Sequence, residues 1–383
     1  MFILFTCITA IFFAFNIGAS GAAASMGIAY GSGAMPIRKI AQFICGFGVL
    51  LGAVLGGGEV VKTIGSGIVP DEIITIHLAL IILVSASITL FFANLGGIPL
   101  STSEVTVGAV VGVGMAFQTL FINKIIIIVL FWLLIPFLAF LFSFCLNKAI
   151  KLINKKLSFL VNRSWKRILS FLVILTGFLE AFSAGMNNVA NSVGPLVAAN
   201  IITVEKGTML GGISVALGVI ILGGKVIETN GKRITNFSLL QGSAISGIGA
   251  TLVIIASLFG IPVPQTQITT CSILGIGASD NGKDMWKKAI ILKLIKTWVL
   301  SPFISLFISY SLVEIFIFHR FFYAVILSIP IFIFSIFSLK IKNKENQFTL
   351  LKIEKKTRLS KLSFASIRSK RRRLQSTKYK EYP

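Results

Sequence analysis

The sequence predicts an all-α polytopic membrane protein made of two halves of similar sequence. The 383 residues are 55% hydrophobic and 13% charged, with a mean hydropathy of +0.91. That is more apolar surface than a soluble core can bury. Apolar runs of about 20 residues, enough to cross roughly 30 Å of hydrocarbon, recur along the chain. A stretch of small and polar residues at 15–27 also returns at 182–194.

The first half, residues 1–147, is expected to begin with a helix that is interrupted at the small-residue stretch. Glycine and serine are poor residues for a continuous helix, so the span should stop near Gly18 and resume near Met26. Pro99 should open a shorter segment. The expected apolar segments are 1–15, 26–30, 40–57, 73–93, 101–117 and 125–146.

The second half, residues 168–313, repeats this order after a basic loop at 148–167. Its small-residue stretch is expected to break a helix at 185–195, and Pro262 and Pro264 should open its short segment. One further span within 314–340 has no counterpart, and the basic tail 341–383 is expected to be largely disordered. The expected apolar segments are 168–182, 209–222, 239–258, 265–276, 290–312 and 321–339.

Two more landmarks recur in the same order. Residues 57–63, Gly-Gly-Glu-Val-Val-Lys-Thr, align with 223–229, Gly-Gly-Lys-Val-Ile-Glu-Thr, in which the acid and the base are exchanged. Residues 97–104 align with 260–267. Three landmarks in one order indicate a tandem duplication.

The placement of basic residues predicts the topology. Of 36 Lys and Arg, 7 lie in 148–167 and 15 in 340–383, and such clusters mark cytoplasmic segments that can contact anionic lipid. If both are cytoplasmic, the second half crosses the membrane an odd number of times, so the two halves are inverted repeats. We expect about 11 crossings, an outside N-terminus and an inside C-terminus in the cell membrane. RNA binding by the tail and a cleaved signal peptide are less favoured alternatives, so no nucleic-acid partner is expected.

Broken helices in the membrane predict an anion site. The start of a helix carries partial positive charge and free N–H groups, which bind anions without Lys or Arg. Both halves are expected to supply two such starts, and close helix packing is the competing explanation for the small residues. The candidate substrate-binding residues are Ser20, Gly21, Ser25, Ser101, Thr102, Ser103, Asn187, Asn188, Asn191, Ser192, Gln265, Thr266 and Gln267.

Acidic residues at membrane depth are costly and are therefore candidates for ion coupling. The competing explanations are i,i+3 ion pairs with Lys62 and Lys225, or side chains that face water. The candidates are Glu59, Glu104, Glu180 and Glu228.

Other chemistry has little support in the sequence. The four cysteines lie in or beside apolar runs, which predicts buried thiols without disulfides. His77 and His319 each stand alone. We expect no metal site and no cofactor, and the sequence offers no nucleophile with a base for an enzyme.

Residues 185–191, Gly-Met-Asn-Asn-Val-Ala-Asn, resemble the Gly-Ala-Asn-Asp-Val-Ala-Asn motif of the inorganic phosphate transporter (PiT) family. Residues 99–104, Pro-Leu-Ser-Thr-Ser-Glu, resemble that family's Pro-Val-Ser-Thr-Thr-His. The resemblance covers residues 1–312. It implies a cation-coupled oxyanion symporter with its sites between the repeats.

The departures from the motif predict the substrate. Gly21 and Asn188 stand where the family has aspartate. Phosphate near neutral pH keeps a proton that it can donate to a carboxylate, whereas sulfate has none and is repelled by one, so donors without an acid favour sulfate. The pattern is similar to the bacterial sulfate permease branch. Without these acids sodium loses likely ligands, which favours proton coupling.

Two other functions remain open at this stage, namely a phosphate permease that has lost its sodium dependence and an anion channel. Transport of thiosulfate, molybdate or selenate is undecided. A homodimer through spans away from the breaks is compatible with the layout.

Overall fold

A computed structural model describes residues 1–95, 100–156, 163–234, 237–282 and 289–322, which form helices and no strand. Eight helices in this described part are long and apolar enough to cross a membrane. The all-α polytopic class is therefore confirmed, whereas the count of 11 crossings and the orientation stay predictions. Most of the expected span 321–339 and the whole basic tail lie outside the described residues.

In the first half, helix ends coincide with the motifs that the sequence repeats. One helix gives way to another at Gly57, and Ser101 caps the short segment after Pro99. The elements are α1 (Phe2–Ser20), the 3-10 turn η1 (Ala22–Met26), α2 (Gly27–Gly31), α3 (Arg38–Gly56), α4 (Gly58–Ser66), η2 (Asp71–Ile73), α5 (Ile76–Leu95), α6 (Thr102–Phe117) and α7 (Ile122–Lys156).

The second half follows the same order with one difference at its start. Gly223 separates two helices as Gly57 does, and Pro264 precedes the short helix. The elements are α8 (Arg163–Ala198), α9 (Val204–Leu222), α10 (Gly224–Ile234), α11 (Leu239–Leu258), α12 (Gln265–Asn281) and α13 (Ala289–Phe316).

The predicted break at 185–195 is wrong, because α8 is helical throughout this stretch and contains Pro195 within it. Gly185 serves packing instead: a Cβ there would lie 2.0 Å from the carbonyl oxygen of Val49 on α3. Small residues in membrane helices allow such close contact. The described parts of the predicted basic loop, 148–156 and 163–167, are helical instead, because Lys and Arg favour helices and α7 and α8 extend into them.

Close contacts between the halves are reciprocal. In each case a glycine on one helix faces a backbone carbonyl oxygen of the other half, and the contact made by one half has a counterpart in the other. The distances from an added Cβ to that oxygen are 1.9 Å for Gly18 to Val215, 2.0 Å for Gly185 to Val49, 1.8 Å for Gly52 to Phe182 and 2.0 Å for Gly218 to Phe15.

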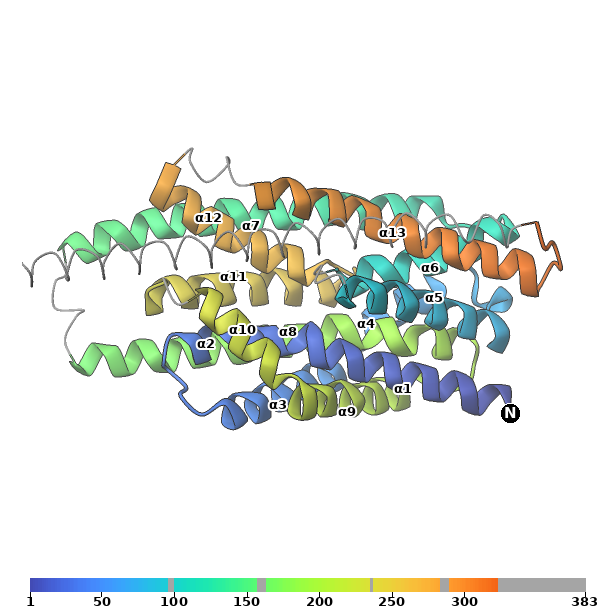
Figure 1. Ribbon diagram of the computed structural model, residues 1–383, viewed down its shortest axis with the longest axis horizontal. Coiled ribbons are helices and arrows are strands. Elements are labelled where there is room, and N and C mark those ends of the chain that lie inside the picture. The colour runs from blue at the N-terminus through green and yellow to red at the C-terminus, as the bar shows by residue number, and fades with distance from the viewer. Residues whose placement is uncertain (96–99, 157–162, 235–236, 283–288, 323–383) are drawn as a thin grey trace, which may run out of the picture. The chain divides into compact units, whose positions relative to one another are not determined.

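Corresponding helices run in opposite directions. Figure 1 shows α1 leaving the N-terminus toward α2, while α8 runs the other way beside it. The helices also exchange partners between halves, because α6 packs along α13 and α12 packs along α7. The packing is not equal, however, since α8 contacts α11 far more extensively than α1 contacts α5.

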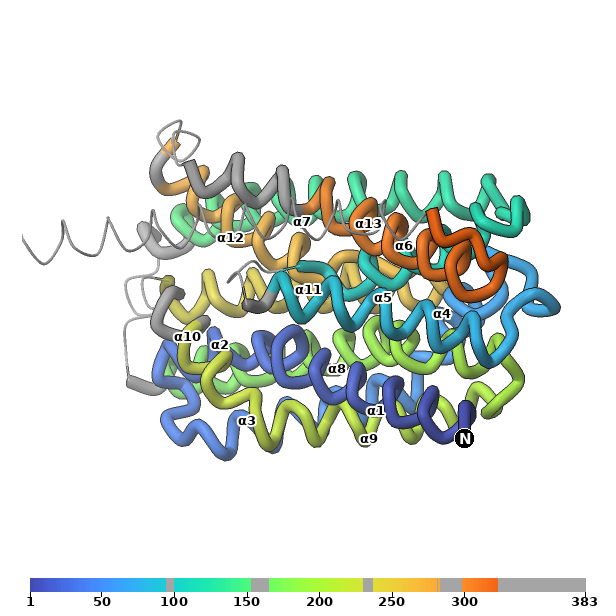
Figure 2. Tube along the Cα trace, turned by 45° about the vertical axis from the view of Figure 1, so that its right-hand side comes forward, coloured from blue at the N-terminus to red at the C-terminus, as the bar shows by residue number. Residues whose placement is uncertain are grey.

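The two short helices begin near the middle of the long ones. Figures 1 and 2 show α5 and α6 beside α13, and α11 and α12 beside α7. The far end of α12 is held by Asp280, which pairs with Lys151 at 2.7 Å and accepts hydrogen bonds from Asn147 and Gln241. This arrangement brings the starts of α6 and α12 to α8 in the interior.

Candidate functional site

Asn187 on α8 holds the extended segment that precedes α12. Its Nδ2 donates to the carbonyl oxygen of Val263 at 2.8 Å, and its Oδ1 accepts from the Val263 N–H at 3.0 Å. The side chain is fully buried. A carboxamide can make this pair of hydrogen bonds because it carries the same donor and acceptor as a peptide group. Asn187 thus satisfies the Val263 N–H at membrane depth and adds a second donor to the carbonyl oxygen, which also accepts from the Gln265 N–H.

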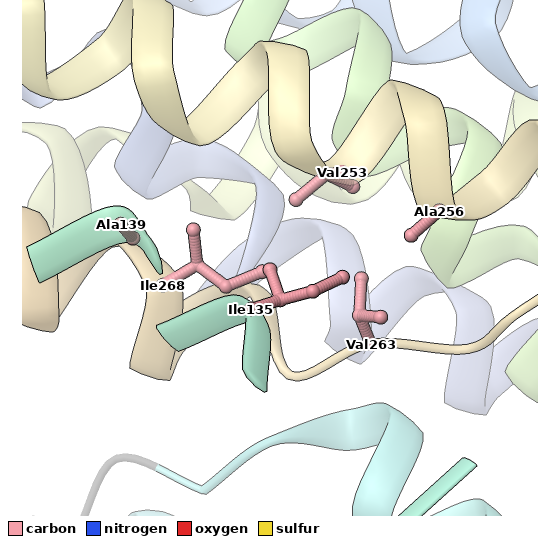
Figure 3. Packing of buried hydrophobic residues seen from close by; sticks show 6 residues of the cluster. All are labelled: Ile135, Ala139, Val253, Ala256, Val263 and Ile268. Atoms are coloured by element: carbon pink, nitrogen blue, oxygen red, sulfur yellow. The ribbon is translucent and has the colours of Figure 1, made fainter. Parts of the chain in front are cut away.

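Further contacts fix the same segment. The Trp132 indole donates to the carbonyl oxygen of Pro262 at 2.8 Å. Figure 3 shows the Val263 side chain in an apolar cluster that also contains Ile135, Ala139, Val253, Ala256 and Ile268 from α7, α11 and α12. The backbone of Val263 is therefore paired with α8 while its side chain is packed between the other helices.

Neutral polar side chains from three helices meet around Asn187. Thr102 Oγ1 donates to Asn188 Oδ1 at 3.2 Å, and Asn187 Nδ2 reaches Ser103 Oγ at 3.0 Å. Asn191 Nδ2 donates to Thr102 Oγ1, and Asn188 Nδ2 donates to Gln265 Oε1 at 3.1 Å. We call Thr102, Ser103, Asn187, Asn188, Asn191 and Gln265 the amide cluster.

The amide cluster is buried except for Gln265, which is partly exposed, and two polar atoms in or beside it lack partners. Asn191 Oδ1 and Thr266 Oγ1 are enclosed atoms with no hydrogen bond within the described part of the chain. The starts of α6 and α12 add partial positive charge beside the cluster. Ser101 caps α6 by accepting from the Glu104 N–H. Such a set of neutral donors and helix starts suits an anion.

Glu104 lies next to the cluster with both carboxylate oxygens engaged. Gln267 Nε2 donates to Oε1, and Ser301 Oγ on α13 donates to Oε2 at 3.1 Å. The side chain is only 3% exposed, so the alternative in which it faces water does not hold.

Glu180 lies on α8, seven positions before Asn187, and is also 3% exposed. Its Oε1 accepts from Thr269 Oγ1 at 2.8 Å, whereas Oε2 has no hydrogen-bond partner among the described residues. The backbone oxygen of Glu180 accepts from Gln265 Nε2 at 3.3 Å. Gln265 therefore joins this residue to the amide cluster.

The other two acidic candidates lie at the surface. Glu59 pairs with Lys62 at 2.6 Å, and both side chains are more than half exposed. Glu228 pairs with Arg38 at 3.3 Å, not with Lys225 as the sequence alternative had it. Exposed pairs of this kind contribute about 0–1 kcal/mol.

The small-residue stretch of the first half does not join the cluster. Ser20 Oγ donates to the carbonyl oxygen of Asn16 on its own helix, and Gly21 keeps a helical conformation. Ser25 packs near Gly177, ten positions before Asn187 and so about 15 Å along α8. The prediction of four converging helix starts is therefore wrong, because α6 and α12 supply two and α8 supplies side-chain amides. Ser192 bonds to the Val189 carbonyl of its own helix.

Sequence reasoning missed Thr269, Ser301 and the backbone of Val263. The following prolines, Pro302 after Ser301 and Pro264 after Val263, are the sequence signals for two of them. Thr269 has no such neighbour. All four cysteines are free, and Cys145 is exposed, contrary to the expected burial. Among the described residues no three His, Cys, Asp or Glu side chains form a metal-binding group.

Comparisons with known proteins agree with this architecture. A sequence profile of the phosphate transporter family matches residues 17–309. The sulfate permease CysP of Bacillus subtilis is 54% identical over 307 residues, covering 80% of this chain and 86% of that protein. A putative phosphate permease of Pyrococcus abyssi is 27% identical over 379 residues, covering 77% and 93%. The solved structure titled "The sodium-dependent phosphate transporter" matches with a TM-score of 0.73 at 27% identity, covering 81% and 97%.

Proposed function

Because the chain belongs to the phosphate transporter family and is a multi-pass membrane transporter of an anion, we propose that it imports sulfate by proton symport with alternating access. The observation that carries this proposal is the amide cluster. Its members offer amide and hydroxyl donors, and no carboxylate takes part in the hydrogen bonds that join them.

The absence of an acid from the amide cluster supports sulfate over phosphate. A carboxylate at position 188 would accept the proton of hydrogen phosphate and would repel sulfate. Asn188 instead presents an amide whose Oδ1 accepts from Thr102 and whose Nδ2 can donate. The 54% identity to a protein named sulfate permease supports the same choice. Phosphate is the second candidate, because more distant relatives are named putative phosphate permeases.

Alternating access is supported by the arrangement of the halves. Corresponding helices run in opposite directions with reciprocal contacts, as in inverted repeats, which alternate around a central site. The unequal packing of α8 with α11 and of α1 with α5 is the asymmetry expected of one of two states. In this arrangement the amide cluster would exchange its internal bonds for bonds to the anion when one side opens.

Proton coupling requires a titratable group near the anion. Glu104 and Glu180 meet this requirement because both are buried and are linked to α12. Glu59 and Glu228 lie in exposed ion pairs and are weaker candidates. We also propose that the basic segments contact anionic lipid and that the protein forms a homodimer.

Uptake of labelled sulfate and phosphate into cells that lack their own carriers tests the substrate. We expect sulfate to accumulate against its gradient and a protonophore to abolish the accumulation. Downhill flux that a protonophore leaves unchanged would indicate a channel. Phosphate uptake that excess sulfate fails to inhibit would contradict the sulfate assignment.

A further inference from the structure

We propose that Glu180 binds the coupling proton and that Gln265 and Thr269 of α12 link its protonation to the anion site. This inference rests on the proton symport proposed above. It goes further by choosing between the two buried carboxyl groups and by naming the contacts that couple proton and anion.

The first step is the geometry of the carboxyl group. Glu180 Oε1 accepts from Thr269, but Oε2 is enclosed without a hydrogen-bond partner among the described residues. Ser246 Oγ on α11 lies near the carboxyl group and has no hydrogen-bond partner of its own within the described part of the chain. An ionised carboxylate with an unpaired oxygen is costly at this depth. A proton on Oε2 removes the charge and provides a donor for Ser246.

The second step is that the described residues of the helices around Glu180 place no fixed counter-charge beside it. Glu180 is the one acidic or basic residue of α8 between Ile168 and Ala198, and α11 has none. On α12 the charged residue is Asp280, which Lys151 neutralises at the far end of the helix. Across from Glu180, α3 presents the buried thiol of Cys45, which donates to the carbonyl oxygen of Ala22. A mobile cation must therefore balance a charged Glu180.

Glu104 differs in the way that decides between the two acids. Both of its oxygens accept hydrogen bonds, from Gln267 and from Ser301. Both of these donors are neutral side chains. Glu104 therefore has the surroundings of a residue that holds α6, α12 and α13 together, whereas Glu180 has a vacant acceptor.

The third step is the link to the anion. Gln265 Nε2 donates to the backbone oxygen of Glu180, and its Oε1 accepts from Asn188 Nδ2. Thr269 lies one turn further along α12 and contacts the carboxyl group. An anion that accepts the hydrogen bond of Asn188 Nδ2 frees Gln265 Oε1. Protonation of Glu180 alters the carboxyl group to which Thr269 Oγ1 donates. Both events act on the first turns of α12. One proton joins the carboxylate on the side where sulfate enters and leaves it on the side where sulfate is released.

Purified protein in proteoliposomes tests this assignment, with labelled sulfate as the probe and E104Q as the matched variant. We expect E180Q to lose the stimulation of uptake by an inward pH gradient, at least about tenfold, while sulfate–sulfate exchange at equal pH continues. E104Q should keep the ratio of gradient-driven uptake to exchange. Full gradient stimulation in E180Q would overturn the proposal.

Two further measurements distinguish a failure of this assignment from a failure of the proposed symport. If E180Q neither accumulates nor exchanges sulfate, T269V decides: a displaced pH profile of exchange supports the proposal and an unchanged profile overturns it. If a sodium gradient drives the wild type and E180Q abolishes that drive, the site takes a metal cation and the proton assignment is wrong. If neither the pH gradient nor the sodium gradient stimulates sulfate uptake by the wild type, the proposed symport itself is wrong. Should it carry phosphate, the same assay with labelled phosphate still tests Glu180.

Discussion

The two small-residue stretches, 15–27 and 182–194, share a sequence pattern but differ in structure. In the first, α1 passes into a 3-10 turn and the Ser20 hydroxyl bonds to its own helix. In the second, α8 continues and Asn187 reaches across to the segment before α12. The glycines at 18 and 185 nevertheless make equivalent close contacts. The two repeats thus share the packing of their glycines. They differ in the side chain at the equivalent positions 20 and 187, where the longer asparagine reaches the site and the serine does not.

The largest expected effect separates Asn187 from its counterpart Ser20. Asn187→Ala leaves the Val263 N–H unpaired, at about 1–3 kcal/mol, and removes the bonds from Asn187 to the Val263 carbonyl oxygen and to Ser103. We expect sulfate uptake to fall at least about 100-fold. Ser20→Ala removes a hydroxyl that bonds within its own helix and should retain most uptake.

Both variants must be quantified in the membrane before uptake is compared. Equal loss of uptake in the two would mean that the halves contribute alike, contrary to the observed structure.

A steric prediction follows from the matched glycines. Gly185→Val and Gly18→Val place a branched side chain against a backbone oxygen of the other half, and should each destabilise the protein by about 1–3 kcal/mol or more. Gly21→Ala is the control, because its nearest atom would be 3.4 Å away. Thermal unfolding of detergent-purified protein measures the difference. A normal melting temperature for Gly185→Val would contradict the close contact.

A smaller effect is expected at Thr102. Thr102→Val keeps the shape but loses a donor to Asn188 and an acceptor for Asn191. We expect the KM for sulfate to rise about tenfold. Ser25→Ala, in the stretch that lies away from the cluster, should leave KM unchanged. An unaltered KM in Thr102→Val would remove Thr102 from the anion site.

The smallest effect concerns Asp280. Burial alone would raise its pKa, but hydrogen bonds from Lys151, Asn147 and Gln241 and the charge of Lys151 outweigh it and hold the pKa below its usual value. A lowered folded pKa adds stability above the unfolded pKa, and this stability is lost as pH falls through the folded pKa. Asp280→Asn should therefore lower the melting temperature at pH 7 by an amount equivalent to about 1 kcal/mol or less. The difference from wild type should shrink as the pH falls below about 4 and vanish below the lowered folded pKa, and a constant difference would contradict the contribution of its charge.

Much of the fold could be predicted because apolar runs, glycine pairs and prolines mark helix ends directly. The short helices after Pro99 and Pro264 begin where the sequence places them. The continuity of α8 through 185–195 could not be predicted in this way, because glycine and proline interrupt a helix only when neighbours do not fill the space. The asparagines of the site were predicted, but their role as side-chain donors on an unbroken helix depends on contacts with Val263 and Thr102 that the sequence does not encode locally.

The central claim is that Asn188, a neutral donor where the family has an acid, selects an oxyanion without a proton. Competitive uptake of labelled sulfate and phosphate by wild type and Asn188→Asp in proteoliposomes tests it most directly. We expect the wild type to take up sulfate in the presence of excess phosphate, and Asn188→Asp to lose sulfate uptake and gain phosphate uptake. A wild type that prefers phosphate, or an aspartate variant that still prefers sulfate, would contradict the account.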